Sequence, residues 1–302
     1  MELAMIGLGR MGANMAERLL RGGHRVVVHD RKTEAIKSLV AKQAVGADSL
    51  DAVASALTPP RAVWLMVPSG EPVDQTIQAL IGCLEKEDVI IDGGNSNYKD
   101  TQRKAEMLKE KGIHYVDTGT SGGVWGLTEG YSMMVGGEAE VVERLRPIFE
   151  TLAPASDKGW GYVGPNGAGH FVKMIHNGIE YGLMQAFAEG FALMERKKEF
   201  KLDLHQVAEI WREGSVVRSW LLDLIAKALG DNPDLHGIKP YVADSGEGRW
   251  TVFEGVDLDV STPVITLSLL QRLRSRDPEP FADKLLAMMR YQFGGHPIKR
   301  EG

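Results

Sequence analysis

The strongest constraint on the fold is a glycine motif close to the N-terminus. An apolar run at residues 3–6 leads into a GxGxxG sequence, and an amphipathic segment follows at residues 15–20. A strand, a glycine turn and a helix in this order are typical of a dinucleotide-binding βαβ unit, in which the backbone approaches a pyrophosphate at the helix N-terminus. We therefore expect a dinucleotide to bind at the motif, which comprises Gly7, Leu8, Gly9, Arg10, Met11 and Gly12. The alternative is a glycine-rich turn without a ligand.

An acidic residue follows the second predicted strand. Residues 24–29 form this strand, and Asp30 comes directly after it. A carboxylate at this position accepts hydrogen bonds from the ribose hydroxyls and repels a 2′-phosphate, which favours NAD. Arg31 and Lys32 come next, and an adjacent arginine is the usual way to accommodate NADP. We therefore predict NAD as cofactor with NADP possible; the alternative for both cations is a solvated loop.

Apolar runs and helix-compatible segments alternate through the first half of the chain. The runs at 62–67 and 88–92 are apolar almost throughout, as expected for strands covered on both faces of a parallel sheet. Further strands are expected at 113–117, 131–136 and 161–163, and helices at 33–42, 72–85, 98–111 and 139–152. The pattern predicts an α/β Rossmann-type doubly wound domain over residues 1–165.

Several predicted strands end in residues suited to ligand contact. Ligands of doubly wound sheets bind beyond the carboxyl ends of the strands. The residues that follow strands in this way are Val67, Pro68, Asn95, Ser121, Gly122 and Gly123. Each of these loops is, taken singly, also consistent with plain turn chemistry.

The second half of the chain is predicted to be an all-α domain over residues 166–302. Long periodic segments replace the strand pattern, and we expect helices at 169–197, 203–212, 219–229, 262–276 and 278–293. A turn-rich sequence at 164–167 separates the two domains. A polar loop with spaced glycines, residues 244–251, is expected to interrupt the helices.

The helix that opens the second domain has a narrow polar face. At about 100° per residue, Lys173, His176, Asn177 and Glu180 fall within about 100° of arc, and apolar side chains occupy the other faces. A polar arc usually faces bulk water. Here the apolar arc is wide, and two glycines four residues apart lower helix propensity, which indicates close backbone packing. The pattern therefore favours a proton-transfer site facing a pocket.

Composition and charge exclude several classes of partner. The chain has 302 residues, 25% of them charged, and a net charge of −6 without clustered basic residues, so no nucleic acid partner is expected. No apolar run approaches the roughly 20 residues that span a bilayer, and the N-terminus lacks the features of a signal peptide. The single cysteine, Cys83, is expected to be a buried thiol in a reducing compartment. These features predict a cytoplasmic protein without membrane partners.

The motifs resemble those of the decarboxylating 6-phosphogluconate dehydrogenases, within the β-hydroxyacid dehydrogenase superfamily. The resemblance covers nearly the whole chain and rests on residues 7–12, 90–96, 121–123, 169–181 and 290–296. Residues 169–181 are the most specific, because simpler members of the superfamily share the lysine and asparagine without the full His-Asn-Gly-Ile-Glu-Tyr run. The chain is similar to the short form of the family, which lacks the second helical repeat of the long enzymes.

The resemblance implies oxidative decarboxylation of 6-phosphogluconate to ribulose 5-phosphate and carbon dioxide, with hydride transfer to NAD(P) and no metal. Lys173 matches the family's base, and a buried lysine close to other donors can have its pKa lowered enough for this role. Glu180 matches the acid that protonates carbon 1 of the enediol. Asn177 and His176 are implied to hold the substrate hydroxyl region.

The resemblance also implies where the rest of the substrate binds. Ser121, Gly122 and Gly123 would receive the carboxylate end, and Asn95 would lie between cofactor and substrate. The phosphate is assigned to four residues: Tyr181, Arg272, and Arg290 and His296 from the tail of a neighbouring subunit. Arginine suits this task because its planar fork matches phosphate oxygens. A homodimer or a dimer of dimers is therefore expected.

One loop departs from the family pattern. The family's Lys-Gly-Thr-Gly-Lys-Trp loop appears here as residues 245–250, with Ser245, Glu247 and Arg249 in place of the lysine, the threonine and the second lysine. This departure motivates an alternative, a β-hydroxyacid dehydrogenase that acts on a small unphosphorylated 3-hydroxy acid. A third hypothesis is a catalytically silent nucleotide-sensing protein, against which the intact Lys173 and Glu180 argue.

Overall fold

The structure is a computed structural model that describes residues 1–299, without the side chain of Phe293. The chain divides into two compact units between His176 and Asn177, and this division falls inside helix α8 (Ala168–Arg196). Among residues 1–299, no helix combines the length and the apolar character needed to cross a membrane.

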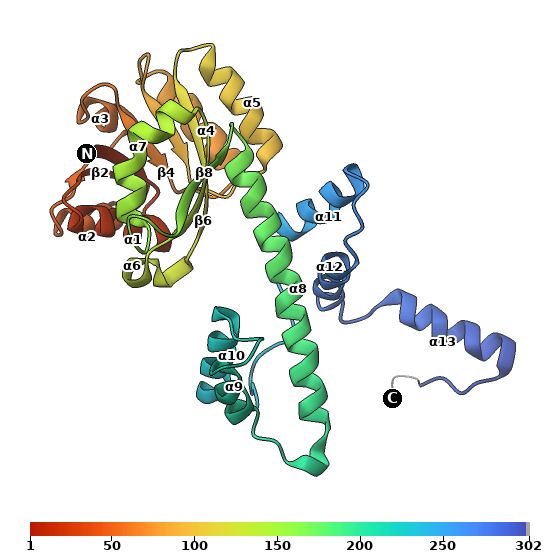
Figure 1. Ribbon diagram of the computed structural model, residues 1–302. Coiled ribbons are helices and arrows are strands. Elements are labelled where there is room, and N and C mark those ends of the chain that lie inside the picture. Colours follow the sequence, from red (N-terminus) through yellow and green to blue (C-terminus); the bar gives the residue numbers. More distant parts are fainter. Residues whose placement is uncertain (300–302) are drawn as a thin grey trace. The chain divides into compact units, whose positions relative to one another are not determined.

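The first unit is built on a single eight-stranded sheet, counted over the described residues (Figure 1). In sheet order the strands are β3 (Val45–Gly46), β2 (Arg25–His29), β1 (Glu2–Ile6), β4 (Ala62–Leu65), β5 (Val89–Asp92), β6 (His114–Ser121), β7 (Ser132–Gly136) and β8 (Trp160–Gly164). All neighbouring strands are parallel except β6 and β7, which pair antiparallel. From β1 the chain first adds β2 and β3 on one side, and it then adds β4 and the later strands on the other side. This change of direction between β1 and β4 is typical of a doubly wound fold.

Helices cover both faces of this sheet (Figure 1). They are α1 (Arg10–Arg21), α2 (Thr33–Val40), α3 (Leu50–Ser55), α4 (Glu71–Ile81), α5 (Tyr98–Lys109), α6 (Gly126–Glu129) and α7 (Ala139–Leu152), with a 3₁₀ turn at Gly123–Trp125. Along β1, Leu3 and Met5 join a core cluster with α1 and α7, whereas Ala4 and Ile6 join a second cluster with α4 and α5. This period of two explains the continuous apolar runs, because both faces of β4 and β5 are buried.

The predicted α/β Rossmann-type architecture is confirmed, and three short elements of the sheet domain were not predicted. Strand β3 has only two residues, α3 has six and α6 has four. None of them is long enough to show a periodic pattern. Helix α3 begins at a local signal instead, since Ser49 Oγ accepts a hydrogen bond from Ala52 N at 3.1 Å.

The second unit is helical, as predicted. Beyond α8 it contains α9 (Leu204–Arg212), α10 (Trp220–Asp231), α11 (Glu247–Asp257), α12 (Pro263–Arg274) and α13 (Phe281–Gly294), with a 3₁₀ turn at Lys198–Phe200. Asp203 and Ser219 cap the N-termini of α9 and α10. The prediction of a loop over 244–251 is wrong from residue 247 onward, because Gly246, at φ +107°, turns the chain directly into α11.

Cys83 is half-buried, whereas the sequence predicted a buried thiol. Its Sγ donates to Asp51 Oδ1 at 3.1 Å and to Ala79 O at 3.4 Å. Partial burial and the neighbouring Asp51 carboxylate raise the pKa of the thiol, which disfavours the reactive thiolate.

Candidate active site

The glycine motif forms a tight turn between β1 and α1. Gly7 has φ +91°, and a Cβ on it would lie 2.5 Å from the carbonyl oxygen of Met66 on the neighbouring strand end. A Cβ on Gly12 would lie 2.0 Å from Gly7 O, so the first turn of α1 packs directly on the strand end. Gly9, by contrast, has open space where a Cβ would point, and it caps α1 without a side-chain hydrogen bond. The start of α1 therefore fits the diphosphate of a dinucleotide.

Asp30 is oriented by backbone groups. Its Oδ2 accepts from Leu8 N at 2.6 Å and its Oδ1 accepts from Lys32 N at 2.8 Å. The carboxylate thus joins the end of β2 to the glycine turn, and its remaining lone pairs can accept ribose hydroxyls. Arg31 is exposed beside it.

The loops after β4 and β5 lie at the same edge of the sheet as the glycine turn. Leu65 pairs in register with Ile6 and with Asp92, so Val67, Pro68 and Asn95 follow strands that end side by side. Asn95 has φ +54°, a conformation that asparagine tolerates. Its amide accepts from Thr120 N at 3.0 Å and donates to Thr120 O at 3.2 Å. Asn95 thereby connects the β5 loop to β6, one residue before Ser121.

The start of α8 is held by a buried side chain of β6, by a backbone carbonyl of β5 and by a side chain of α5. Asp117 accepts from Gly167 N at 2.8 Å and from His170 N at 2.9 Å, which caps the helix. The imidazole of His170 lies 3.1 Å from Asp92 O, through Nε2, and 2.7 Å from Thr101 Oγ1, through Nδ1. A carbonyl can only accept, so Nε2 carries the hydrogen.

Asp92 continues this network toward the β5 loop. Its Oδ1 accepts from Gly94 N at 2.9 Å, and its Oδ2 accepts from Ser96 Oγ and Tyr115 OH at 2.7 and 2.8 Å. Burial and the Asp92 carboxylate together raise the pKa of Tyr115 well above its ordinary value, so the phenol stays a donor. Sequence reasoning missed Asp92, Asp117 and His170. The available signal was an aspartate at two predicted strand ends.

Lys173 lies one turn after His170 and packs on β6. A Cβ on Gly119 would lie 2.4 Å from Lys173 Cβ, so only glycine allows this approach. Lys173 is 5% exposed, and its Nζ lies 3.4 Å from His176 Nδ1. Two residues after Gly119, β6 ends in the loop of Ser121, Gly122 and Gly123, in which both glycines have positive φ. The structure thus brings the predicted base to the strand that carries the predicted carboxylate loop.

Asn177, Glu180 and Tyr181 continue α8 in the second unit. Tyr181 is 4% exposed, and the Arg272 guanidinium lies 3.4 Å from the centre of its ring. A Cβ on Gly248 would lie 2.3 Å from the same ring, so α11 packs closely on it. The structure thus brings together Tyr181 and Arg272, both predicted to bind phosphate.

Asp244 organises the loop that departs from the family pattern. Its carboxylate accepts from Tyr181 OH at 3.3 Å, from Gly246 N at 3.0 Å and from Arg249 Nη2 at 2.8 Å. Burial opposes ionisation of this side chain, but the hydrogen bonds from Arg249 and Gly246 outweigh it and lower the pKa of Asp244. Within the same loop, the Glu247 carboxylate accepts a hydrogen bond from Ser245 Oγ. Arg249 is therefore the cation that this loop places beside Tyr181.

Arg290 and His296, the remaining predicted phosphate ligands, are exposed in the second unit. Arg290 lies on α13 and His296 follows it. Among the described residues, no group of three or more histidine, cysteine, aspartate or glutamate side chains is arranged to hold a metal ion.

The comparisons with known proteins agree with this geometry. A family model for the NAD binding domain of 6-phosphogluconate dehydrogenase matches residues 2–164, and a model for the C-terminal domain of the same enzyme matches residues 169–283. The chain belongs to the 6-phosphogluconate dehydrogenase family. The predicted family membership is confirmed.

The relatives include one enzyme named as NAD(+)-dependent and one named as NADP(+)-dependent. The chain is 41% identical to the NAD(+)-dependent, decarboxylating 6-phosphogluconate dehydrogenase of Haloferax volcanii, over 100% of this chain and 99% of that protein. It is 38% identical to the NADP(+)-dependent enzyme of Bacillus subtilis, over 91% of this chain but only 61% of that protein. The match thus spans nearly all of the first relative and about three fifths of the second.

Two solved structures have a similar fold. The 6-phosphogluconate dehydrogenase of Plasmodium falciparum superposes with a TM-score of 0.84 at 29% identity, over 100% of this chain and 66% of that one. A 3-hydroxyisobutyrate dehydrogenase of Salmonella typhimurium has a TM-score of 0.77 at 20% identity, over 92% and 95%. This second likeness shows the fold alone.

Proposed function

We propose that the protein oxidatively decarboxylates 6-phosphogluconate to ribulose 5-phosphate and carbon dioxide with NAD(P). The observation that carries the proposal is the burial of Lys173 against Gly119, two residues before the Ser121 loop. An amine held in this place can accept a proton from a substrate hydroxyl, as a general base does. Membership of the family and the decarboxylating relatives support the same substrate class.

The dinucleotide would be held at the carboxyl edge of the parallel strands. The residues assigned to it are Gly7, Leu8, Gly9, Arg10, Met11, Gly12, Asp30, Arg31, Val67, Pro68 and Asn95. When bound, a nicotinamide supplies the hydride acceptor. Asp30 disfavours a 2′-phosphate, so NAD is the preferred form, and the exposed Arg31 leaves NADP possible.

In this proposal Lys173 and Glu180 handle the protons. Lys173 Nζ takes the proton of the substrate's 3-hydroxyl as the hydride leaves carbon 3. The resulting ammonium then returns this proton to the 3-keto oxygen, which accepts the electron pair released as carbon dioxide departs, and an enediol forms. Glu180 delivers a proton to carbon 1 of the enediol while Lys173 takes the hydroxyl proton back, and His176 and Asn177 orient the hydroxyl.

The phosphate end is assigned to Tyr181, Arg272 and Arg249. The ring of Tyr181 keeps the Arg272 guanidinium stacked, and Asp244 holds Arg249 through its Nε and Nη2. Both arginines retain donors for phosphate oxygens. Arg290 and His296 of a second copy would complete this site.

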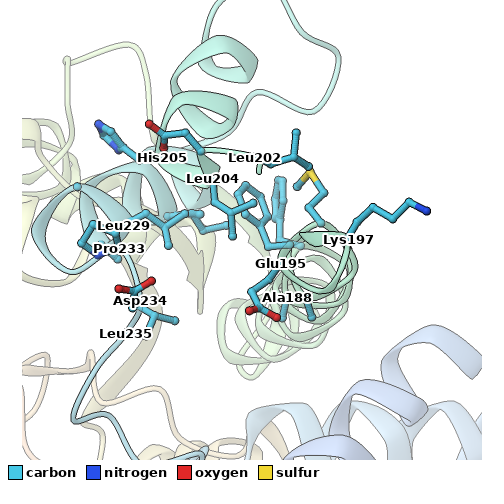
Figure 2. Close-up of a pocket in the computed structure, with 18 of the residues that line it drawn as sticks. Ala188, Glu195, Lys197, Leu202, Leu204, His205, Leu229, Pro233, Asp234 and Leu235 are labelled. Carbon is cyan, nitrogen blue, oxygen red and sulfur yellow. The ribbon is translucent and has the colours of Figure 1, made fainter. Parts of the chain in front are cut away.

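Exposed apolar surface on the second unit supports a homodimer, or a dimer of dimers. Helix α13 exposes 74% of Phe281 and about half of Leu285 and Leu286. Figure 2 shows a groove of about 1240 Å³ among α8, α9 and α10 that is lined largely by apolar side chains. Among the described residues, the groove contains none of the predicted catalytic side chains. Surfaces of this kind are typical of subunit interfaces.

A cytoplasmic location is part of the same proposal.

The second candidate is a dehydrogenase of a small unphosphorylated 3-hydroxy acid, favoured by Ser245 and Glu247 in place of phosphate ligands. Steady-state rates with 6-phosphogluconate and with 3-hydroxyisobutyrate, using NAD and NADP and following carbon dioxide, distinguish the two. Carbon dioxide release from 6-phosphogluconate is expected. Lys173→Met is expected to abolish turnover while dinucleotide binding persists. Turnover of 3-hydroxyisobutyrate alone would contradict the main proposal.

A further inference from the structure

The loop between β6 and β7, residues 122–131, begins at the glycines assigned to the substrate carboxylate. It wraps the buried ring of Tyr131, since a Cβ on Gly126 would lie 2.1 Å from that ring. Gly122 and Gly123 have positive φ, and glycine loses more backbone freedom on ordering than any other residue. Contacts from outside the loop therefore add to this internal packing in holding its ordered form.

Arg18 of α1 supplies one of these contacts. Its Nη1 donates to Leu127 O at 3.2 Å, within α6 of the loop. Its Nε donates to Thr151 O at 2.9 Å and its Nη2 to Ala153 O at 2.6 Å, at the C-terminal end of α7. A cation is favoured there by the helix dipole. One guanidinium thus ties α1 to the loop and to the helix end beside it.

Asn14 adds a second link from the same face of α1. Its Nδ2 donates to Val124 O at 3.3 Å, near the start of the loop. Positions 14 and 18 are one turn apart, so both side chains project from one side of the helix. The N-terminus of this helix is the glycine turn assigned to the dinucleotide.

We propose that Arg18, aided by Asn14, is a positioning residue that couples dinucleotide binding at the start of α1 to the order of the carboxylate-binding loop. The identity of the substrate rests on the proposed function above. A dinucleotide that restrains α1 also restrains the loop through Arg18. The substrate that binds next then loses less free energy to the ordering of the loop. Such coupling makes each ligand strengthen the binding of the other.

The test compares Arg18→Met with Arg21→Met. Arg21 lies on the same helix and pairs with Glu17, so its loss removes a cation without touching the loop. Hydrogen exchange of residues 122–130 is measured with and without NADH. Calorimetry measures 6-phosphogluconate binding to the protein alone and to the NADH complex, in which no turnover occurs.

In the wild type, NADH is expected to slow exchange in the loop and to tighten 6-phosphogluconate binding by a factor of about 5 to 150. In Arg18→Met the factor is expected to fall toward one, the loop to exchange faster, and NADH binding to stay unchanged. Arg21→Met is expected to behave as the wild type. Should Arg18→Met not fold, Arg18→Lys keeps the charge but cannot reach three carbonyls at once, and the same loss of coupling is expected.

The inference is overturned if the Arg18 variant that folds keeps the wild-type coupling and loop exchange, or if Arg21→Met loses them equally. A wild-type protein that binds no 6-phosphogluconate contradicts the proposed function instead. In that case the exchange experiment with NADH alone still decides the inference: NADH must protect residues 122–130 in the wild type and not in the Arg18 variant.

Discussion

Replacing Gly119 by alanine tests whether close packing of α8 on β6 positions the proposed base. The new Cβ would lie 2.4 Å from Lys173 Cβ and 2.6 Å from Gly169 O, whereas ordinary contact begins at 3.4 Å. The helix and the strand would therefore have to separate by about 1 Å. Gly119 does not have a positive φ, so the effect arises from this contact rather than from backbone strain.

The magnitude follows from the forced displacement. Overpacking of this kind costs about 1–3 kcal/mol of unfolding free energy, and a catalytic group misplaced by about 1 Å loses about 100-fold in rate. We expect kcat of Gly119→Ala to fall by about that factor, while the dissociation constant of NAD stays at the wild-type value. The assay combines steady-state kinetics, dinucleotide fluorescence titration and thermal unfolding.

Gly161→Ala is the matched control, because Gly161 is also a strand glycine without positive φ, yet no atom lies within 4 Å of its Cβ position. This variant is expected to keep wild-type activity. A folded Gly119→Ala protein with wild-type kcat would refute the reasoning that Lys173 is positioned by contact with β6.

Three further predictions concern pH, cofactor and tail. Burial lowers the pKa of His24, so the folded state takes up its proton at lower pH than the unfolded state, and stability is lost as pH falls below the unfolded value of about 6.5. His24→Gln should reduce this loss of unfolding free energy by at most about 1.4 kcal/mol per pH unit, as measured in denaturant titrations. The same pH dependence in the variant and in the wild type would argue against this role of His24. Asp30→Ala should raise the NADP to NAD preference in kcat/KM, and it should also weaken both cofactors because Leu8 N loses its acceptor; an unchanged ratio would contradict the assignment. Truncation after Tyr291 should raise KM for 6-phosphogluconate strongly while NAD binding persists, and unchanged substrate kinetics would exclude a role for the tail.

The sequence predicted the larger elements because their periodicity reflects burial. Strands β4 and β5 are buried at every position, and the apolar runs at 62–67 and 88–92 predicted them. The start of α11 was missed because glycine spacing at 244–251 is typical of loops, and only the φ of Gly246 shows that the chain enters a helix there.

The candidate site was predicted in part. The polar face of α8 was visible from helical spacing, and the burial of Lys173 agrees with it. The network of Asp92, Asp117 and His170 was not predicted: the aspartates at two predicted strand ends indicated part of it, but its hydrogen bonds join two strands and a helix far apart in sequence. The contacts of Arg18 were not predicted either. Its partners are backbone carbonyls, which every residue has, so no residue type in the sequence indicates them.

Helix α8 runs without interruption through the point at which the chain divides, between His176 and Asn177. Lys173 lies before that point and Glu180 after it, seven residues further on. In the proposed mechanism the proton acceptor and the proton donor therefore belong to one helix, so a one-residue insertion between them would rotate their side chains onto different faces.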